Sequence, residues 1–192
     1  MAKVIGIVGS PHENGNTEIL MNKVLETIAK EGLETELIKL CNKKISPCKG
    51  HSAEVCKKVC PLKDDMVEIY EKVTEADGLI IGSPVYMGLA TAQTAVVMGR
   101  LVHLQRKGIM RNKIGGAIAA GKLRNGGQEG VISDIVRWMQ IMEMFIASSE
   151  NSGTAHFGAT SLGDTSKDNG GLESAKMLGK RVVELINIKG NN

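Results

Sequence analysis

Residues 4–17 have the sequence VIGIVGSPHENGNT, and the fold class can be inferred from this stretch onward. Its first five residues are apolar without alternation, which is typical of a strand buried on both faces of a sheet. A glycine-rich polar loop, residues 9–17, follows. Apolar side chains four residues apart then predict a helix over residues 17–30, ended by Gly32. A strand, a polar loop and a helix in this order begin a unit of parallel strands joined by a crossover helix.

The rest of the chain repeats this order of strand and helix. Apolar runs predict strands at residues 4–8, 36–40, 79–81, 114–120 and 144–147. Amphipathic patterns predict further helices from Asp64 or Asp65 through Val73, and over residues 91–106, 129–143 and 172–187. We expect an α/β fold: a flavodoxin-like three-layer sandwich whose five-stranded parallel sheet has the order 2-1-3-4-5, with helices on both faces. The prediction is a single domain over residues 1–192, with a cysteine-rich loop insertion at 41–63 and a polar loop at 148–168.

The composition excludes several classes of partner. The 192 residues carry a net charge of +3, which is too mild to indicate binding to nucleic acid. No stretch reaches the length of a membrane span, and the first residues lack the apolar run of a signal peptide. We therefore expect a cytoplasmic protein without a nucleic-acid or membrane partner, in a compartment that keeps cysteines reduced.

Three glycine-rich loops follow the first, third and fourth predicted strands, at residues 9–17, 82–88 and 121–128. In the expected strand order, the carboxyl ends of these strands face one crevice. The first loop enters a helix N-terminus, which favours an anion, and its own donors are Ser10, His12, Asn14, Asn16 and Thr17. The second loop offers Tyr86 and Met87 to a planar ring.

Two other phosphate-binding motifs are absent. Gly15 is followed by Asn16 and Thr17 rather than by Lys and Ser or Thr, and no G-x-G-x-x-G occurs after the first strand. The loops together suit a flavin mononucleotide (FMN) better than a nucleoside triphosphate. Two simpler interpretations stay open: Asn16 or Thr17 only caps the helix, and Tyr86 only packs over the sheet edge.

The chain resembles the NAD(P)H-dependent FMN reductase superfamily and, within it, the iron–sulfur flavoproteins of anaerobic archaea and bacteria. The resemblance covers nearly the whole chain and is carried, in order, by residues 9–11, 14–17, 44–50, 63–66, 82–86, 126–129, 156–159, 171–173 and 178–181. It implies FMN as cofactor, with its phosphate on Ser10, His12, Asn14, Asn16 and Thr17. The flavin ring would lie on Pro84, Val85, Tyr86, Met87 and Gly88, with help from Ala120, Gly121, Gly126 and Gly127. The resemblance also implies a homodimer or homotetramer.

All four cysteines lie within 20 residues: Cys41, Cys48, Cys56 and Cys60. Clustered cysteines in a reducing compartment indicate metal or redox chemistry rather than structural disulfides. The pattern of the resembled family is C-x2-C-x2-C-x5-C, and alignment on Cys48 puts His51 and Glu54 at its second and third positions. Four thiols are nevertheless available for a [4Fe-4S] cluster. Zinc, a redox disulfide and thiols without such a role are the alternatives.

The expected function is that of an FMN-dependent oxidoreductase or electron-transfer flavoprotein. Electrons would come from NAD(P)H or a ferredoxin-like redox protein and go to a quinone, a disulfide, an oxygen product or a one-electron acceptor. No side chain stands out as a general acid or base, so we name no catalytic residue. The alternatives are a non-enzymatic flavin or thiol electron carrier, a redox sensor, and a zinc-stabilised protein without redox activity.

Overall fold

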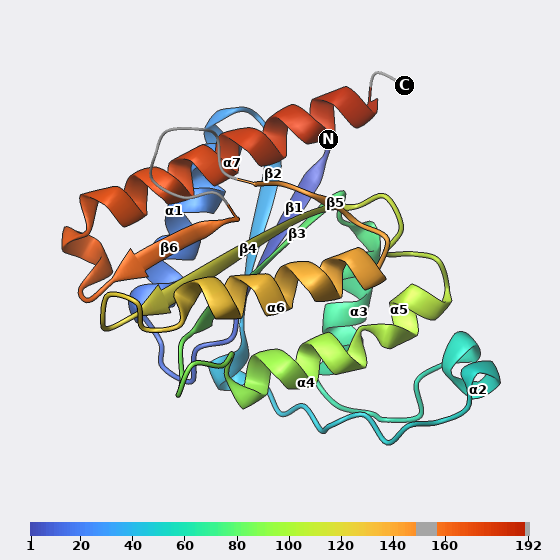
Figure 1. The fold of residues 1–192 in the computed structure, drawn as a ribbon. Coiled ribbons are helices and arrows are strands. Elements are labelled where there is room, and N and C mark those ends of the chain that lie inside the picture. Colours follow the sequence, from blue (N-terminus) through green and yellow to red (C-terminus); the bar gives the residue numbers. More distant parts are fainter. Residues whose placement is uncertain (149–156, 191–192) are drawn as a thin grey trace.

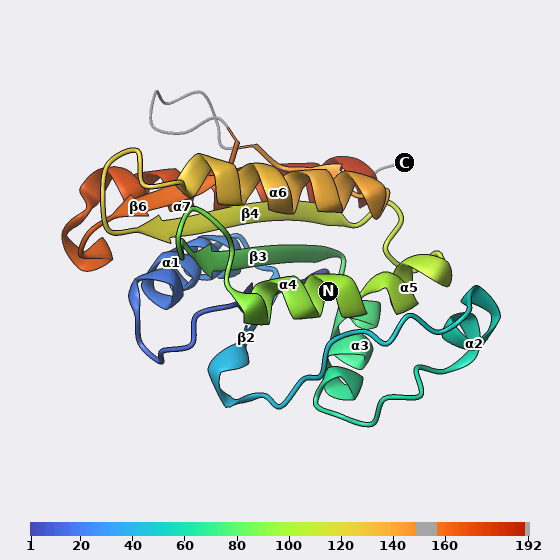
Figure 2. The same cartoon turned by 60° about the horizontal axis from the view of Figure 1, so that its bottom comes forward.

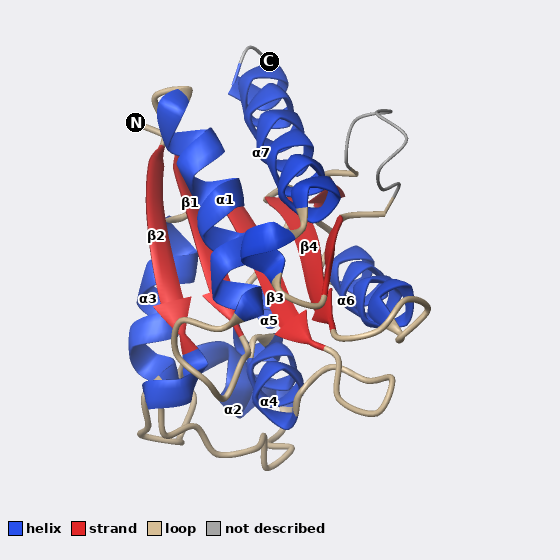
Figure 3. Cartoon of the chain, turned by 90° about the vertical axis from the view of Figure 1, so that its left-hand side faces the viewer, coloured by secondary structure: helices blue, strands red, loops and turns tan. Residues whose placement is uncertain are grey.

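The computed structural model describes residues 1–148 and 157–190. A parallel sheet forms the middle layer, and its strands are β1 (Lys3–Val8), β2 (Glu34–Lys39), β3 (Gly78–Pro84), β4 (Ile114–Gly121), β5 (Phe145–Ile146) and β6 (Ala159–Leu162). The main order is β2-β1-β3-β4-β5, which confirms the predicted α/β flavodoxin-like fold (Figure 1). Figure 3 shows the arrowheads of the long strands directed toward the same end of the sheet.

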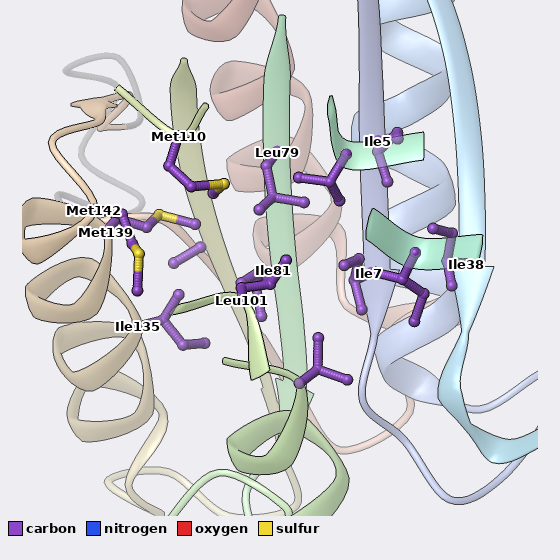
Figure 4. Close-up of a cluster of buried hydrophobic side chains, with 14 of the residues drawn as sticks. Ile5, Ile7, Ile38, Leu79, Ile81, Leu101, Met110, Ile135, Met139 and Met142 are labelled. Atoms are coloured by element: carbon purple, nitrogen blue, oxygen red, sulfur yellow. The ribbon is translucent and has the colours of Figure 1, made fainter. Parts of the chain in front are cut away.

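Helices cover both faces of the sheet, because its strands carry apolar side chains on both sides. One face packs against α1 (Asn16–Lys30) and α7 (Asn169–Gly190). The other face packs against α3 (Met66–Glu75), α4 (Ala92–Arg100), α5 (Val102–Arg106) and α6 (Gln128–Ile141). Figure 4 shows this second core, with Ile5 and Ile7 of β1 and Leu79 and Ile81 of β3 pointing into it.

The fifth position of the sheet is shared by two short strands. β5 pairs with the start of β4 at Ile114 and Gly115, whereas β6 pairs with its end over residues 118–121. The expectation of five strands is therefore corrected to six, and the loop predicted at 148–168 is wrong at Ala159–Leu162. Part of that loop, including His156 of a motif cited above, lies outside the described residues.

Three further differences concern helices. The helix predicted over 91–106 is two helices that meet at Leu101, where the Leu104 N–H bonds to the Leu101 carbonyl in a tighter i to i+3 turn. A short helix, α2 (Ala53–Lys58), lies within the predicted cysteine-rich loop, and Ser52 caps it. The single-turn helices η1 (Leu40–Asn42) and η2 (Thr165–Lys167) follow β2 and β6. None of the helices described is long and apolar enough to span a bilayer.

Candidate functional site

A cavity of about 560 Å³ opens at the carboxyl ends of β1, β3 and β4. This volume lies within the usual range for small-molecule sites. Its lining comes from all three glycine-rich loops and from the segment after β6: Ser10, His12, Gly15, Asn16, Thr17, Pro84, Val85, Tyr86, Ala120, Gly121, Lys122, Gly163 and Asp164. The three loops thus meet at one cavity, as their positions after the three strands led us to expect.

The N-terminus of α1 reaches this cavity without a side-chain cap. Gly15 is the N-cap residue and has no side chain to accept a hydrogen bond, and within residues 1–148 and 157–190 no other side chain accepts one from the first-turn N–H groups. The first bond that closes the helix runs from the Ile19 N–H to the Gly15 carbonyl, so the N–H groups of Asn16, Thr17 and Glu18 have no carbonyl partner within α1. The interpretation in which Asn16 or Thr17 only caps the helix is therefore wrong. The N–H groups of the first turn and the positive end of the helix dipole can therefore interact with an anion.

Side chains of the first loop lie around this helix end. Ser10 and Thr17 are buried, and Ser10 Oγ accepts a hydrogen bond of 3.1 Å from the His12 N–H. Asn16 Oδ1 accepts a 2.9 Å hydrogen bond from the Thr165 N–H, which attaches the segment after β6 to the start of α1. Asn14 does not line the cavity: its φ is +52°, and its N–H donates to Glu18 Oε2 at 2.7 Å.

The second loop ends in a tight turn beside the cavity. Tyr86 and Leu89 exchange backbone hydrogen bonds of 2.9 and 3.0 Å, and both central residues have positive φ, +51° at Met87 and +81° at Gly88. This is the geometry of a type I′ turn. Tyr86 lines the cavity with about half of its surface exposed, whereas Met87 is 99% exposed, and neither Met87 nor Gly88 is part of the lining.

Buried hydroxyl groups lock the first loop to the second. Thr91 Oγ1 donates to the Gly9 carbonyl at 2.6 Å, and the Thr91 N–H donates to Ser83 Oγ at 3.0 Å. Thr94 Oγ1 lies 2.9 Å from Thr91 Oγ1, and a Cβ on Gly9 would lie 1.7 Å from Thr94 Oγ1. The start of the first loop is therefore held in one position that only glycine fits.

The third loop contributes Ala120 and Gly121, but Gly126 and Gly127 do not line the cavity. Gly127 is the N-cap of α6 with a φ of +100°, and a Cβ there would lie 3.0 Å from the Gly88 Cα. Gly127 thus sets how closely the second and third loops pack. The sequence analysis missed four lining residues: Gly15, Lys122, Gly163 and Asp164.

The cysteines divide into a group of three and one separate residue. Cys48, Cys56 and Cys60 line a second, small cavity of about 50 Å³ beside α5, whereas Cys41 lies in η1 and does not line it. Figure 2 shows α2, which carries Cys56, next to α5. Over residues 1–148 and 157–190, no three His, Cys, Asp or Glu side chains are arranged so as to hold a metal ion.

Arg100 lines this small cavity and bonds to several of the side chains around it. It is 1% exposed and binds Asp64 through both guanidinium nitrogens, at 2.7 and 3.1 Å. It also donates to the Tyr70 hydroxyl at 3.2 Å and to Cys60 Sγ at 3.5 Å. Desolvation alone would raise the pKa of Asp64, but hydrogen bonds from Arg100 and from the Ser46 and Met66 N–H groups outweigh it and hold that pKa below its ordinary value.

Comparison with known proteins identifies the family of this chain. The model of a family described as NADPH-dependent FMN reductase matches residues 2–157. An iron–sulfur flavoprotein of Methanocaldococcus jannaschii is 45% identical over 192 residues, covering 97% of this chain and 98% of that protein. An iron–sulfur flavoprotein of Methanosarcina thermophila is 36% identical over 191 residues, covering 99% and 98%.

Solved structures show the same fold at low sequence identity. RosB with a bound riboflavin-phosphate intermediate has a TM-score of 0.81 at 16% identity, covering 100% of this chain and 81% of that one. A WrbA-like flavodoxin of Agrobacterium tumefaciens has a TM-score of 0.71 at 16% identity, covering 98% and 99%. The resemblance stated from the sequence and the expectation of an oxidoreductase are thus confirmed. The chain belongs to the NADPH-dependent FMN reductase family.

Proposed function

We propose that the protein binds FMN in the cavity at the carboxyl ends of β1, β3 and β4, and uses it to oxidise a reduced nicotinamide. One observation carries this proposal: the uncapped N-terminus of α1 opens into that cavity beside the buried hydroxyls of Ser10 and Thr17. A phosphate is the anion that such a helix end binds.

The remaining lining residues have roles that follow from their chemistry. Pro84, Val85 and Tyr86 form one wall for the flavin ring, and Ala120 and Gly121 leave room for its close approach. A bound FMN supplies the redox chemistry, because it takes up electrons in pairs and releases them one at a time. The protein binds the phosphate, orients the ring and leaves Tyr86 half exposed at the entrance.

The finer part of the proposal is a [4Fe-4S] cluster in the cysteine segment, which the names of two relatives support. The residues there suit an anionic group. Arg106 Nη1 is buried without a hydrogen-bond partner among the described residues, and Arg106 lines the small cavity with three cysteines. A cluster would supply single electrons to a one-electron carrier. The other acceptors that we propose, a quinone, a disulfide or an oxygen product, would take a pair of electrons from the flavin itself.

The assembly and the electron donor complete the proposal. We propose NAD(P)H as donor, with a ferredoxin-like protein as the second candidate, and a cytoplasmic homodimer or homotetramer of a single 192-residue domain. Light scattering at micromolar concentration measures the assembly, and a mass of about 20.5 kDa would contradict it.

The test of the flavin site is the substitution Thr17→Ala. Protein stripped of flavin is titrated with FMN and followed by flavin fluorescence. Loss of one hydrogen bond to the phosphate should weaken FMN binding by about 1 kcal/mol, or roughly fivefold.

Thr27→Ala is the matched control. Thr27 lies on the same helix but does not line the cavity, and its Oγ1 donates a hydrogen bond to the Lys23 carbonyl. This variant should leave the FMN dissociation constant unchanged. Equal weakening by both variants would show a general effect on α1 and contradict the proposed phosphate site.

A further inference from the structure

The small cavity beside α5 brings together four side chains that can bind a metal. They are Cys48, His51, Cys56 and Cys60. Cys41, the fourth cysteine of the chain, is not among them. His51 is half-buried at this cavity, whereas Glu54 is exposed on α2 and pairs with Lys58 at 3.8 Å. The structure thus separates the two residues that replace cysteines of the family pattern: one faces the cavity and the other faces solvent.

Two of these four residues are held in place by the buried side chains of Arg100 and His103. Arg100 donates to Cys60 Sγ at 3.5 Å, and Asp64 fixes Arg100 in turn. The His103 Nδ1 lies 2.5 Å from the Cys56 carbonyl oxygen, which can only accept, so Nδ1 donates. Cys56 and Cys60 therefore form a fixed side of the cavity.

The other two residues, Cys48 and His51, lie in a stretch without regular secondary structure. The Gly50 N–H donates to Cys48 Sγ at 3.4 Å. Cysteine binds metals as the thiolate. Because the cavity holds only about 50 Å³ and its side chains are not yet arranged to hold an ion, binding requires this stretch to shift around the fixed side.

The arginine side chains that line the small cavity favour a negatively charged ligand. Within the part of the chain that the structure describes, the buried Arg106 Nη1 has no hydrogen-bond partner, which costs free energy unless a bound group accepts from it. Arg100 has its counter-charge in Asp64. A neutral disulfide between two of the cysteines would offer no charge to Arg106, which lines the same cavity. An iron–sulfur cluster with thiolate ligands carries net negative charge.

We infer that Cys48, His51, Cys56 and Cys60 are the ligands of the metal centre, and that Cys41 is not a ligand. This inference rests on the proposed cluster. Imidazole replaces thiolate at some irons of iron–sulfur clusters, so three cysteines and one histidine form a chemically sound set.

The experiment compares single substitutions in the full chain, purified without oxygen and reconstituted with ferrous iron and sulfide. Cys41→Ser should keep the iron and sulfide of the original protein. His51→Ala and Cys56→Ser should lose them during gel filtration. All three should keep their FMN, since the flavin cavity contains none of these residues.

A second measurement separates ligation by His51 from a structural role. Pulsed paramagnetic resonance of the reduced protein should show a nitrogen coupling that persists in Cys41→Ser and disappears in His51→Cys, although His51→Cys retains iron. Loss of iron in Cys41→Ser, or full retention in His51→Ala, would overturn the ligand set.

Two outcomes of the metal analysis would contradict an iron–sulfur centre in the small cavity. Zinc without sulfide would overturn the assignment of an iron–sulfur centre. Protein that binds FMN but takes up no metal would overturn the inference while leaving the flavin proposal intact.

Discussion

Arg100→Met should lower the free energy of unfolding by about 3–5 kcal/mol, the usual cost of removing one partner from a buried ion pair. Arg100 is 1% exposed, and its partner Asp64 is mostly buried, so the substitution leaves a carboxylate without its counter-charge. The Ser46 carbonyl, which accepts from Arg100 at 2.8 Å, also loses its donor. Urea unfolding followed by circular dichroism measures the change.

The double variant Arg100→Met with Asp64→Leu is the control. Replacing both charges by apolar side chains of similar size should restore much of the stability. A double variant as unstable as Arg100→Met alone would show that packing, and not the unpaired carboxylate, causes the loss.

The pH dependence gives an independent check. Because the folded-state pKa of Asp64 lies below its ordinary value of 3.8, the ionised carboxylate contributes stability above that pH and loses it as the pH falls through the folded-state value. The difference in stability between the original protein and Arg100→Met should therefore narrow in acid. A difference that is constant from pH 7 to pH 3 would contradict this origin.

Gly9→Ala should destabilise the fold by about 3 kcal/mol and weaken FMN binding as well. The added Cβ would lie 1.7 Å from Thr94 Oγ1 and 3.0 Å from Thr94 Cβ, and Thr94 is buried. Overpacking of this kind costs about 1–3 kcal/mol, and the fixed hydroxyl network places this site at the upper end. Since the first loop starts at Gly9, its displacement would also move Ser10. Thermal unfolding and FMN titration measure the two effects.

Two variants test the cause. Adding Thr94→Ala to Gly9→Ala removes the oxygen that clashes and should recover part of both losses. Gly99→Ala is the matched glycine control: a Cβ on this helical residue meets no atom within 4 Å, so stability should hold or rise. Additive effects of Gly9→Ala and Thr94→Ala would exclude the clash as the cause.

The sequence predicted the sheet order and the meeting of the loops because β1, β3 and β4 are continuous apolar runs followed by small residues. It missed β6 because Thr160 and Ser161 are polar. Ser161 is nevertheless buried, with its Oγ 2.7 Å from Thr165 Oγ1. A polar residue satisfied by a partner within the fold gives no apolar signal. Missing β6 also meant missing the part of the cavity wall that follows it.

The buried ion pair of Arg100 and Asp64 was not predicted from the sequence, for a related reason. Arginine is ordinarily exposed, and nothing in the chain marks Arg100 as an exception. Its partner Asp64 lies 36 residues away and looked like a helix cap. The grouping of His51 with three cysteines likewise depends on how α2 packs against α5, which spacing alone does not show.

The division of the fifth sheet position between β5 and β6 bears on self-association through sheet edges. A long, flat edge strand offers unpaired backbone groups to another chain and promotes aggregation. Here one edge consists of segments of two and four residues, too short to template a partner strand. The opposite edge, β2, is six residues long but carries Glu34, Glu36 and Lys39. One edge of the sheet is therefore protected from pairing with another chain by its short strands, and the other edge by its charged side chains.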